Sequence, residues 1–363
     1  MTTPLDDLAF MARALFVAER GRGRTSPNPM VGAVVVSPDG VVVGQGAHLV
    51  AGGPHAEIVA LEEAAGRARG STLYCTLEPC SHTGRTGPCV ERIVSAGIRR
   101  VVVAVGDPNP QVAGRGIAFL TSHGVEVITG VGRVLATRQH APFFTWVTSG
   151  RPFVTLKAAT SADGFVGTGT GPVRLTGAAA DRYFHRQRAE IDALAVGSGT
   201  VLTDNPFLTP RGAFRHRPLT RVVFDWRGRV PASARLFSTL SAGPVIMVVS
   251  ERALATAAAH FSELERRGVT IERFGARALG PVLERLGTRQ LLSLLVEGGP
   301  ALHTAFSEAG LVDRLQWVTT PHTLGSGVPA SPVFDAEKWA HAPSRTTWFG
   351  ADRLLEIDVH RTD

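Results

Sequence analysis

The sequence predicts an α/β protein with two domains, and three observations carry that prediction. Helix-like and strand-like segments alternate through the 363 residues. Several strand-like segments are continuous Val-rich runs, which is typical of strands covered on both faces. The alternation pauses at 150–152 and starts again at Phe153. Two domains are the ordinary expectation for this length, and we expect them to span residues 1–148 and 149–363.

The first domain is expected to be a three-layer α/β/α arrangement. A helix should begin near Thr3-Pro4, where a capping residue, a proline and an acidic first turn coincide. Strands 31–36 and 41–44 should form a hairpin that turns at 38–40. The remaining elements are expected as a helix over 55–69, a strand over 71–77, a helix from about Pro88, strands over 100–105 and 125–129, and a transition over 138–148.

The second domain should alternate in the same way without repeating the first. We expect its strands near 153–157 and over 192–196, 221–225, 245–249, 291–297, 315–319 and 354–359, with helices over 177–190 and 301–309. Strands that alternate with helices favour a largely parallel sheet.

Composition narrows the class of protein. Hydrophobic residues make up 44% of the chain and charged residues 19%, so it can bury real cores. The net charge of +7 comes mostly from arginines scattered among acids. We therefore favour pockets for a phosphorylated substrate and cofactor, and keep nucleic-acid binding as a weaker alternative.

Cysteine use and the N-terminus indicate the compartment. Three cysteines are too few for a disulfide scaffold, which favours a reducing environment. The first residues carry acid where a signal peptide needs base, and no apolar run reaches membrane-spanning length. We expect a cytoplasmic protein without a membrane partner.

One short motif points to a metal. His55 and Glu57, followed by Cys80 and Cys89, offer an imidazole, two thiolates and a carboxylate. Zinc takes such ligands in tetrahedral sites, and catalytic zinc leaves one position for water. We assign His55, Cys80 and Cys89 as ligands and Glu57 as the proton carrier. A surface histidine with packing cysteines is the alternative, and Cys75, within a strand, is expected to be core.

The wider pattern resembles a known family. The matching segments are 27–32, 52–57, 76–82, 84–89 and 107–110, and with the second domain they resemble the bifunctional riboflavin-biosynthesis deaminase/reductase family across nearly the whole chain. The eight residues between Cys80 and Cys89 distinguish it from deaminases with Pro-Cys-x-x-Cys. The resemblance implies a cytidine-deaminase-like domain followed by a dihydrofolate-reductase-like α/β domain.

The resemblance implies a reaction for the first domain. Its substrate would be 2,5-diamino-6-ribosylamino-4(3H)-pyrimidinone 5′-phosphate, which loses its 2-amino group by hydrolysis. Asn28 resembles the amide that orients the ring, and His48, His82 and Arg85 resemble further substrate contacts. Gly87 stands where the family usually has a proline, which loosens a loop without removing a ligand.

For the second domain the resemblance implies an NADPH-dependent reduction of the ribosyl group to ribityl. Lys157 and Asp204 match catalytic residues near the sugar. Residues that match substrate contacts are Pro172, Arg188, Leu208, Arg211 and Glu297. Residues that match cofactor contacts are Ala159, Arg174, Thr200, Asp204, Gly299, Pro300, Ala301, Leu302, His303, Thr304 and Ala305. Gly298-Gly299-Pro300 also lies where a strand gives way to a helix, a place suited to a phosphate.

The second domain departs from the family pattern. Arg174 replaces an aromatic residue, Pro172 replaces a serine, and Asn205 stands where a second Asp is common. Arg174 could stack on a ring or pair with the 2′-phosphate of NADPH. The alternatives to a bifunctional enzyme are therefore a deaminase with an inactive or altered reductase, a nucleic-acid deaminase and, last, a zinc-stabilised binding module. The family resemblance also implies a homo-oligomer, a dimer or tetramer.

Overall fold

The computed structural model describes residues 4–81, 87–110 and 112–359. The chain separates into two compact units, Met1–Gly150 and Arg151–Asp363. Among the described residues, no helix combines the length and apolar character that crossing a membrane requires. The units are treated separately below.

The first unit is a three-layer α/β/α domain, as predicted. Its sheet has the strand order β2-β1-β3-β4-β5, with β1 antiparallel to both neighbours and β3, β4 and β5 mutually parallel. The strands are β1 (Gly32–Val36), β2 (Val42–Ala47), β3 (Thr72–Cys75), β4 (Arg100–Val103) and β5 (Glu126–Thr129). The helices are α1 (Pro4–Ala18), α2 (Ala56–Ala64), α3 (Cys89–Ser95), α4 (Arg115–Ser122) and α5 (Arg133–Ser149), with short 3-10 turns at Glu19–Gly21 and Ala65–Ala68.

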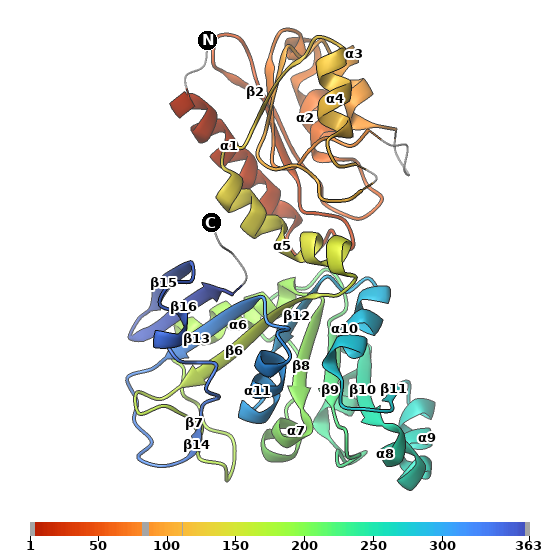
Figure 1. Ribbon diagram of the computed structural model, residues 1–363, viewed down its shortest axis with the longest axis vertical. Helices are drawn as coiled ribbons and strands as arrows, with labels where there is room; N and C mark the ends of the chain where they lie inside the picture. Colours follow the sequence, from red (N-terminus) through yellow and green to blue (C-terminus); the bar gives the residue numbers. More distant parts are fainter. Residues whose placement is uncertain (1–3, 82–86, 111, 360–363) are drawn as a thin grey trace. The chain divides into compact units, whose positions relative to one another are not determined.

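Both helical layers of this unit approach the sheet closely. Helices α1 and α5 cover one face and α2, α3 and α4 the other (Figure 1). Glycines allow the closest approaches: a Cβ at Gly32 would lie 2.1 Å from the Ala14 carbonyl of α1, and one at Gly46 would lie 2.2 Å from the Ala56 carbonyl of α2. The backbone of α2 therefore rests directly on β2.

The second unit is built on a long mixed sheet with the order β11-β10-β9-β8-β12-β6-β13-β16-β15. All pairs from β11 to β13 are parallel, and β16 and β15 extend the sheet in antiparallel fashion. The strands are β6 (Phe153–Thr160), β8 (Ala193–Gly197), β9 (Thr220–Phe224), β10 (Val245–Ser250), β11 (Thr270–Phe274), β12 (Ser293–Val296), β13 (Arg314–Thr319), β15 (Ser344–Phe349) and β16 (Asp352–Asp358). Strands β7 (Phe165–Gly167) and β14 (Val328–Pro329) form a separate antiparallel pair.

Helices cover both faces of this sheet. They are α6 (Ala178–Glu190), α7 (Ser198–Asp204), α8 (Glu251–Thr256), α9 (Ala258–Arg266), α10 (Leu279–Thr288) and α11 (Pro300–Glu308), with 3-10 turns at Arg235–Ala242 and Glu337–Trp339. Alternate strand residues enter two separate cores, one beneath α10 and α11 and one beneath α9 and the 235–242 turn. The predicted α/β alternation is confirmed for this half.

Several elements were not expected. The predicted transition over 138–148 is wrong, because those residues belong to α5, which continues through Pro142. Helix α4 was missed because it starts at a glycine without a side-chain cap of its own. Elements α7 to α10, β7, β11, β14 and β15 were also missed, and most of them are short or strongly polar segments.

Candidate active sites

The start of α2 positions the first part of the metal motif. His55 is the N-cap residue, with extended backbone angles, so the helix begins one residue later than predicted. Glu57 lies in the first turn and is only 3% exposed. Burial raises the pKa of the Glu57 carboxyl above its ordinary value. The N-terminal turn of α2 thus presents an imidazole and a solvent-shielded carboxyl group to one cavity.

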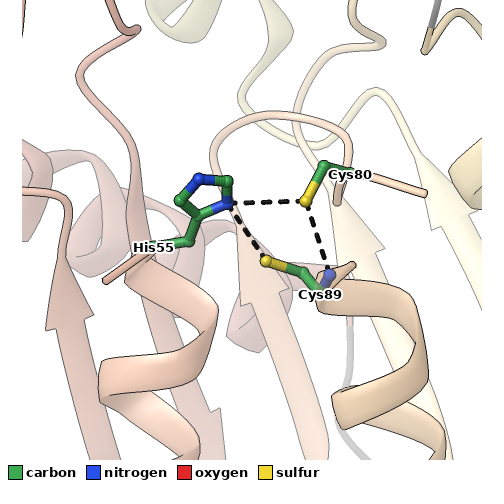
Figure 2. Close-up of side chains that lie close together, drawn as sticks. All are labelled: His55, Cys80 and Cys89. Carbon is green, nitrogen blue, oxygen red and sulfur yellow. Dashed lines mark hydrogen bonds between the residues drawn. The ribbon is translucent and has the colours of Figure 1, made fainter. Parts of the chain in front are cut away.

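The two cysteines meet His55 from other elements. Cys80 follows β3 in a loop, and Cys89 is the first residue of α3. Figure 2 shows the three side chains converging: His55 Nδ1 lies 3.2 Å from Cys89 Sγ and 3.5 Å from Cys80 Sγ. Their ligand atoms all lie within 4.8 Å of one another. Tetrahedral zinc with ordinary Zn–N and Zn–S bonds separates N and S ligands by roughly 3.6 Å, so this donor set fits zinc.

The charge state of Cys80 also suits a metal, while the hydrogen bond with Cys80 and burial raise the pKa of the Cys89 thiol. Hydrogen bonds from Cys89 and from His55, against the effect of burial, lower the pKa of the Cys80 thiol to about 4. The backbone N–H of Cys89 donates to Cys80 Sγ at 3.4 Å. Cys75 is fully buried in β3 and is not part of this group, in agreement with its assignment to the core.

Asn28 and His48 form a connected pair beside the metal group. His48 Nδ1 lies 2.9 Å from the Pro54 carbonyl oxygen, and His48 Nε2 lies 3.0 Å from the amide nitrogen of Asn28. The carbonyl can only accept, so Nδ1 carries the proton and Nε2 accepts from the Asn28 amide. Burial lowers the pKa of His48, which favours this neutral form. The arrangement leaves the Asn28 amide oxygen available to a ligand.

These residues line one cavity of about 270 Å³. Predicted residues on its wall are Asn28, His48, His55, Glu57 and Cys80. Sequence reasoning missed Phe143, Trp146 and Val147, which reach the cavity from α5. The aromatic run at 143–146 was the available signal, but it lay in the segment assigned as a transition. His82 and Arg85 lie outside the described residues.

A buried carboxylate secures the loop that carries Cys80. Glu78 is 4% exposed, and its oxygens accept backbone N–H groups from the start of α4 and the loop before it. The donors are Asp107, Gly114, Gly116 and Ile117, at 3.0 to 3.3 Å. An anion at a helix N-terminus is stabilised by the unpaired N–H groups and the helix dipole. Glu78 therefore caps α4 from a distance and ties it to the cysteine loop.

A second cavity, of about 840 Å³, lies in the second unit at the ends of β6 and β12. The predicted residues that line it are Lys157, Ala159, Pro172, Arg174, Arg188, Thr200, Asp204, Arg211, Glu297 and Gly299. Sequence reasoning missed His185, whose ring nitrogens lie 3.2 Å from the backbone nitrogen and from Nε of Arg211. Partial burial raises the pKa of Asp204.

Lys157, Arg188 and Glu297 are half-buried charged residues of this cavity. The Lys157 Nζ atom lies 4.6 Å from the centre of the Phe184 ring. Burial lowers the pKa of Lys157, while the nearby charge of Glu297 opposes that change. Burial would raise the pKa of Glu297, but the charges of Arg188 and Lys157 keep it below its ordinary value. Arg188 donates to both oxygens of Glu297, with Nε at 3.1 Å from Oε1.

The rarity of lysine in this chain is a further sequence feature that singles out Lys157. The chain has 38 lysines and arginines, and the only lysines are Lys157 and Lys338. The chain thus places one of its two lysines at a half-buried position in this cavity. Lysine differs from arginine in that burial readily lowers its pKa, which suits proton transfer.

Other predicted cofactor and substrate residues lie elsewhere. Leu208 is 5% exposed and packs in a core beneath the sheet. On α11, His303 is buried with Nε2 3.3 Å from the Val296 carbonyl, and Thr304 bonds the Ser331 hydroxyl at 2.8 Å. Ala301, Leu302 and Ala305 line a different cavity, and Pro300 starts the helix.

The positions that depart from the family pattern have local explanations. Arg174 is 69% exposed and pairs with Asp181 at 2.8 Å. Asn205 adopts a left-handed conformation at the end of α7, which asparagine tolerates, and its side-chain oxygen accepts the backbone N–H of Arg235. Both Pro172 and Arg174 remain at the cavity wall.

The residues around this cavity fit a dinucleotide cofactor. Helix α11 starts at Gly299 without a side-chain cap, and a Cβ at Gly299 or Gly199 would meet only open space. A phosphate can therefore approach the backbone closely at both points.

Comparison with known proteins covers both units. The model described as "Cytidine and deoxycytidylate deaminase zinc-binding region" matches residues 5–105, and "RibD C-terminal domain" matches residues 152–346. The chain is 39% identical over 323 residues to the riboflavin biosynthesis protein RibD of Aquifex aeolicus, covering 89% of each chain. It is 38% identical over 349 residues to that of Escherichia coli, covering 93% of this chain and 94% of the relative.

Solved structures agree over almost the full length. A form of Acinetobacter baumannii RibD has a TM-score of 0.83 at 34% identity, covering 98% of this chain and 99% of that one. A Thermotoga maritima diaminohydroxyphosphoribosylaminopyrimidine deaminase/5-amino-6-(5-phosphoribosylamino)uracil reductase has a TM-score of 0.85 at 32% identity, with the same coverage.

Proposed function

The chain belongs to the RibD family of riboflavin-biosynthesis proteins, and on that premise we propose how its residues carry out the two reactions. It is an enzyme with a deaminase and a reductase activity, and its cofactors are zinc and NADPH. The match extends over both units, so a chain with deaminase activity alone is not favoured. The substrate is a small molecule, and we propose 2,5-diamino-6-ribosylamino-4(3H)-pyrimidinone 5′-phosphate.

The deaminase reaction is assigned to the cavity that holds His55 and Glu57. Zinc held by His55, Cys80 and Cys89 supplies the Lewis acidity that allows water to attack at neutral pH. Glu57 accepts one proton of the attacking water and delivers it to the ring nitrogen, and it then transfers the remaining hydroxyl proton to the leaving amine. As the new C–O bond forms and the C–N bond breaks, the amine leaves as ammonia.

Asn28 orients the pyrimidine in this cavity. The side-chain N–H of Asn28 donates to His48 Nε2, and this fixes the orientation of the amide. The amide oxygen of Asn28 can then accept from an amino or ring N–H group of the substrate. Trp146 and Phe143 offer apolar surface to the flat ring. We assign His48 as a residue that positions Asn28.

The reductase reaction is assigned to the cavity of Lys157 and Glu297. NADPH held in this cavity would supply the hydride that C1′ of the ribosyl group needs. The C1′–O4′ bond breaks, and the ring oxygen needs a proton to become the hydroxyl of the ribityl chain. Lys157 is the proton donor in this assignment, with Asp204 and Glu297 contacting the sugar hydroxyls and Arg188 and Arg211 on the phosphate side.

A single observation supports the deaminase assignment most strongly. The imidazole and both thiolates converge within one ligand sphere while Glu57 lies buried beside them, unable to serve as an ordinary surface acid. Such a carboxylate has a clear use in proton transfer and little use in stabilising the fold.

Glu57→Gln tests this assignment directly. We expect the variant to keep one zinc per chain but to lose ammonia release by a factor of about 10² to 10⁴ or more, because the amide cannot carry the proton. Glu62→Gln, on the exposed side of the same helix, is the matched control. Ammonia release by Glu57→Gln at the wild-type rate would refute the role of Glu57.

The reductase assignment is tested with the other lysine as its control. Lys157→Met should abolish NADPH oxidation with the deaminated intermediate, while Lys338→Met should leave it unchanged. The two half-reactions are measured separately, so that loss of one does not obscure the other.

We further propose that the protein works in the cytoplasm as a homo-oligomer. The use of two of three cysteines in a reduced metal group supports a reducing compartment. Family resemblance supports a dimer or tetramer. Light scattering at assay concentration checks the oligomer, and a monomeric mass would contradict it.

A further inference from the structure

A row of polar side chains crosses the second sheet from the Lys157 cavity to the edge of the sheet. Lys157 of β6 is in register with Gln316 of β13, which is in turn in register with Glu356 of β16. Glu356 is in register with Arg345 of the edge strand β15. In-register residues on adjacent strands point to the same face, and their strands lie about 5 Å apart. These four residues, which we call the polar row, therefore form one line on one face.

The two middle members of the polar row are buried. Gln316 is 1% exposed and Glu356 is 3% exposed, whereas the side chain of Arg345 is 59% exposed. The next positions along the same face are apolar, with Val318 and Leu354 in a hydrophobic cluster. An amide and a carboxylate in such surroundings cost free energy unless hydrogen bonds compensate for the lost water.

The hydrogen bonds of the polar row have a fixed direction. Arg345 Nε donates to Glu356 Oε2 at 3.1 Å, and Gln316 Nε2 donates to Glu356 Oε1 at 3.2 Å. A carboxylate can only accept, so Glu356 determines which end of the Gln316 amide faces it. The other end, Gln316 Oε1, is buried and has no hydrogen-bond partner. Because buried acceptors are nearly always paired, an open one on the strand beside Lys157 calls for a donor.

Lys157 is the donor within reach. Its ammonium carries three N–H groups on a flexible four-carbon chain, and its strand is the neighbour of β13. In this structure Nζ lies over the Phe184 ring, which occupies one side of the ammonium. Neither Gln316 nor Glu356 lines the Lys157 cavity, so Gln316 can reach a bound substrate only through Lys157.

The remaining charges around Lys157 have both signs. They come from helices, from the end of β12 and from the cavity wall: Asp181, His185 and Arg188 on α6, His303 on α11, Glu297 after β12, and Arg174, Asp204 and Arg211 at the wall. Burial lowers the pKa of Lys157. An acceptor that adds no charge of its own would hold the ammonium without disturbing this balance, and a glutamine oxygen is such an acceptor.

We propose that Gln316 is a positioning residue for Lys157: its amide oxygen, oriented by Glu356, accepts a hydrogen bond from the Lys157 ammonium and holds it protonated for delivery of its proton to the sugar ring oxygen. The inference rests on the proposed function in one respect, the role of Lys157 as proton donor. Nζ exchanges between the face of the Phe184 ring and Gln316 Oε1. A hydrogen bond accepted from an ammonium stabilises its charged form, so Gln316 raises the pKa of Lys157 relative to an apolar residue at the same position.

The small number of lysines allows a direct measurement. Full-length, zinc-loaded protein labelled with ¹³C at lysine Cε gives signals from only Lys157 and Lys338, and Lys157→Met assigns them. In Gln316→Leu the titration midpoint of Lys157 should move to lower pH by about one unit, since one charged hydrogen bond is lost. In Gln316→Glu the added carboxylate should move it to higher pH. The midpoint of Lys338, which is exposed, should stay the same in both variants.

Steady-state kinetics supply a second readout. The alkaline limb of the kcat profile for NADPH oxidation with the deaminated intermediate should follow the Lys157 midpoint. In Gln316→Leu, kcat above the wild-type limb should therefore fall roughly tenfold. The KM for NADPH should stay within about twofold, because Gln316 does not line the cavity. Ammonia release should be unchanged, because the polar row belongs to the second unit.

The chain offers a matched control one pair further along the same strands. Arg314 of β13 donates to Asp358 of β16 at 2.6 Å, but Arg314 is in register with Thr155 instead of Lys157. Asp358→Asn weakens a polar contact between the same two strands and should leave the Lys157 midpoint and the kcat profile unchanged. An equal shift in Asp358→Asn, or a wild-type midpoint in Gln316→Leu, would overturn the proposal.

A third variant covers a failure of Gln316→Leu to fold. Glu356→Gln keeps the size of the side chain but removes the charge that orients the Gln316 amide, so it should move the Lys157 midpoint in the same direction by a smaller amount. An unchanged midpoint in Glu356→Gln would also count against the proposal.

The outcomes separate this inference from the proposed function. If Lys157→Met oxidises NADPH at the wild-type rate, the role of Lys157 as proton donor fails, while the titrations still decide whether Gln316 contacts Lys157. If Lys157→Met abolishes oxidation but Gln316→Leu keeps the wild-type titration and kcat profile, the positioning role of Gln316 alone fails.

Discussion

Replacing Gly46, which does not itself line the deaminase cavity, by alanine should disable the deaminase. Gly46 lies in β2, where the backbone of α2 crosses the strand. An added Cβ would lie 2.2 Å from the Ala56 carbonyl oxygen and 2.7 Å from the Ala60 nitrogen. Both contacts are with backbone atoms, so no side-chain rotation can relieve them.

The required displacement can be read from these distances. Real Cβ atoms stay at least 3.0 Å from such neighbours, so the start of α2 must move by roughly 0.8 Å. Zinc ligation tolerates errors of about 0.2 Å. His55 and Glu57 are attached to that end of the helix, so we expect zinc affinity to fall about 10- to 100-fold, as with changes to outer-shell residues. Overpacking should also cost about 1 to 3 kcal/mol of stability.

The assay compares zinc retention during chelator titration, ammonia release and NADPH oxidation. Ammonia release should fall with zinc retention, whereas NADPH oxidation with the deaminated intermediate should persist because Gly46 lies in the first unit. Gly66→Ala is the control, since a Cβ there meets no atom within 4 Å. Full zinc retention and full ammonia release in Gly46→Ala would refute the argument that the contact between α2 and β2 sets the ligand geometry.

Three further predictions concern buried residues. Cys75→Ala should retain one zinc per chain and ammonia release while losing about 1 kcal/mol of stability, and loss of zinc by metal analysis would contradict its place in the core. Because burial lowers the pKa of Lys157, its ammonium should lose its proton at a lower pH than that of a free lysine, and kcat of the reductase should fall on the alkaline side accordingly. A pH–kcat profile that stays flat up to the ordinary lysine pKa would contradict a lowered pKa for the proton donor. Arg188→Met should lower the free energy of unfolding in urea by about 3 to 5 kcal/mol, because it leaves the Glu297 carboxylate without its arginine partner. The double variant with Glu297→Gln should recover much of that loss. An unchanged unfolding midpoint in Arg188→Met would contradict a stabilising role for the pair.

The metal group was predictable because its chemistry is local. His55 and Glu57 are two residues apart, and Cys80 and Cys89 flank one loop. An imidazole, a carboxylate and two thiolates in that order have few uses other than a catalytic metal. The assignment of Cys75 to the core followed from its position in a strand, where side-chain direction alternates.

Other parts of the sites were not predictable in this way. Trp146 lines the deaminase cavity, but α5 was not recognised, and nothing local indicates which face of that helix approaches residues far earlier in the chain. The local sequence around Glu78 did not predict that its side chain caps α4, because the N–H groups it accepts lie about 30 to 40 residues further along the chain. Its burial is acceptable only because the fold brings those donors to it.

In the reductase half, residues that are consecutive in the sequence were expected to act together but lie in different places. The run Gly299–Ala305 was expected to contact the cofactor as a unit. Successive side chains of a helix point in different directions, so Ala301 and Leu302 line a cavity of about 400 Å³ separate from that of Lys157, while His303 points into the interior. Which side of α11 meets which cavity depends on how the helix packs on the sheet.

The sequence by itself determined the family and the two α/β halves, and it indicated the residues that we propose as zinc ligands and proton carrier. These features depend on residue type and short sequence spacing, because residues within one turn or loop lie close together in space. The tertiary structure decided which distant groups share a cavity. It joined α5 to the deaminase site, paired Arg188 with Glu297, and placed Gln316 beside Lys157. Such encounters depend on the packing of whole helices and strands, and packing is a property of the complete chain.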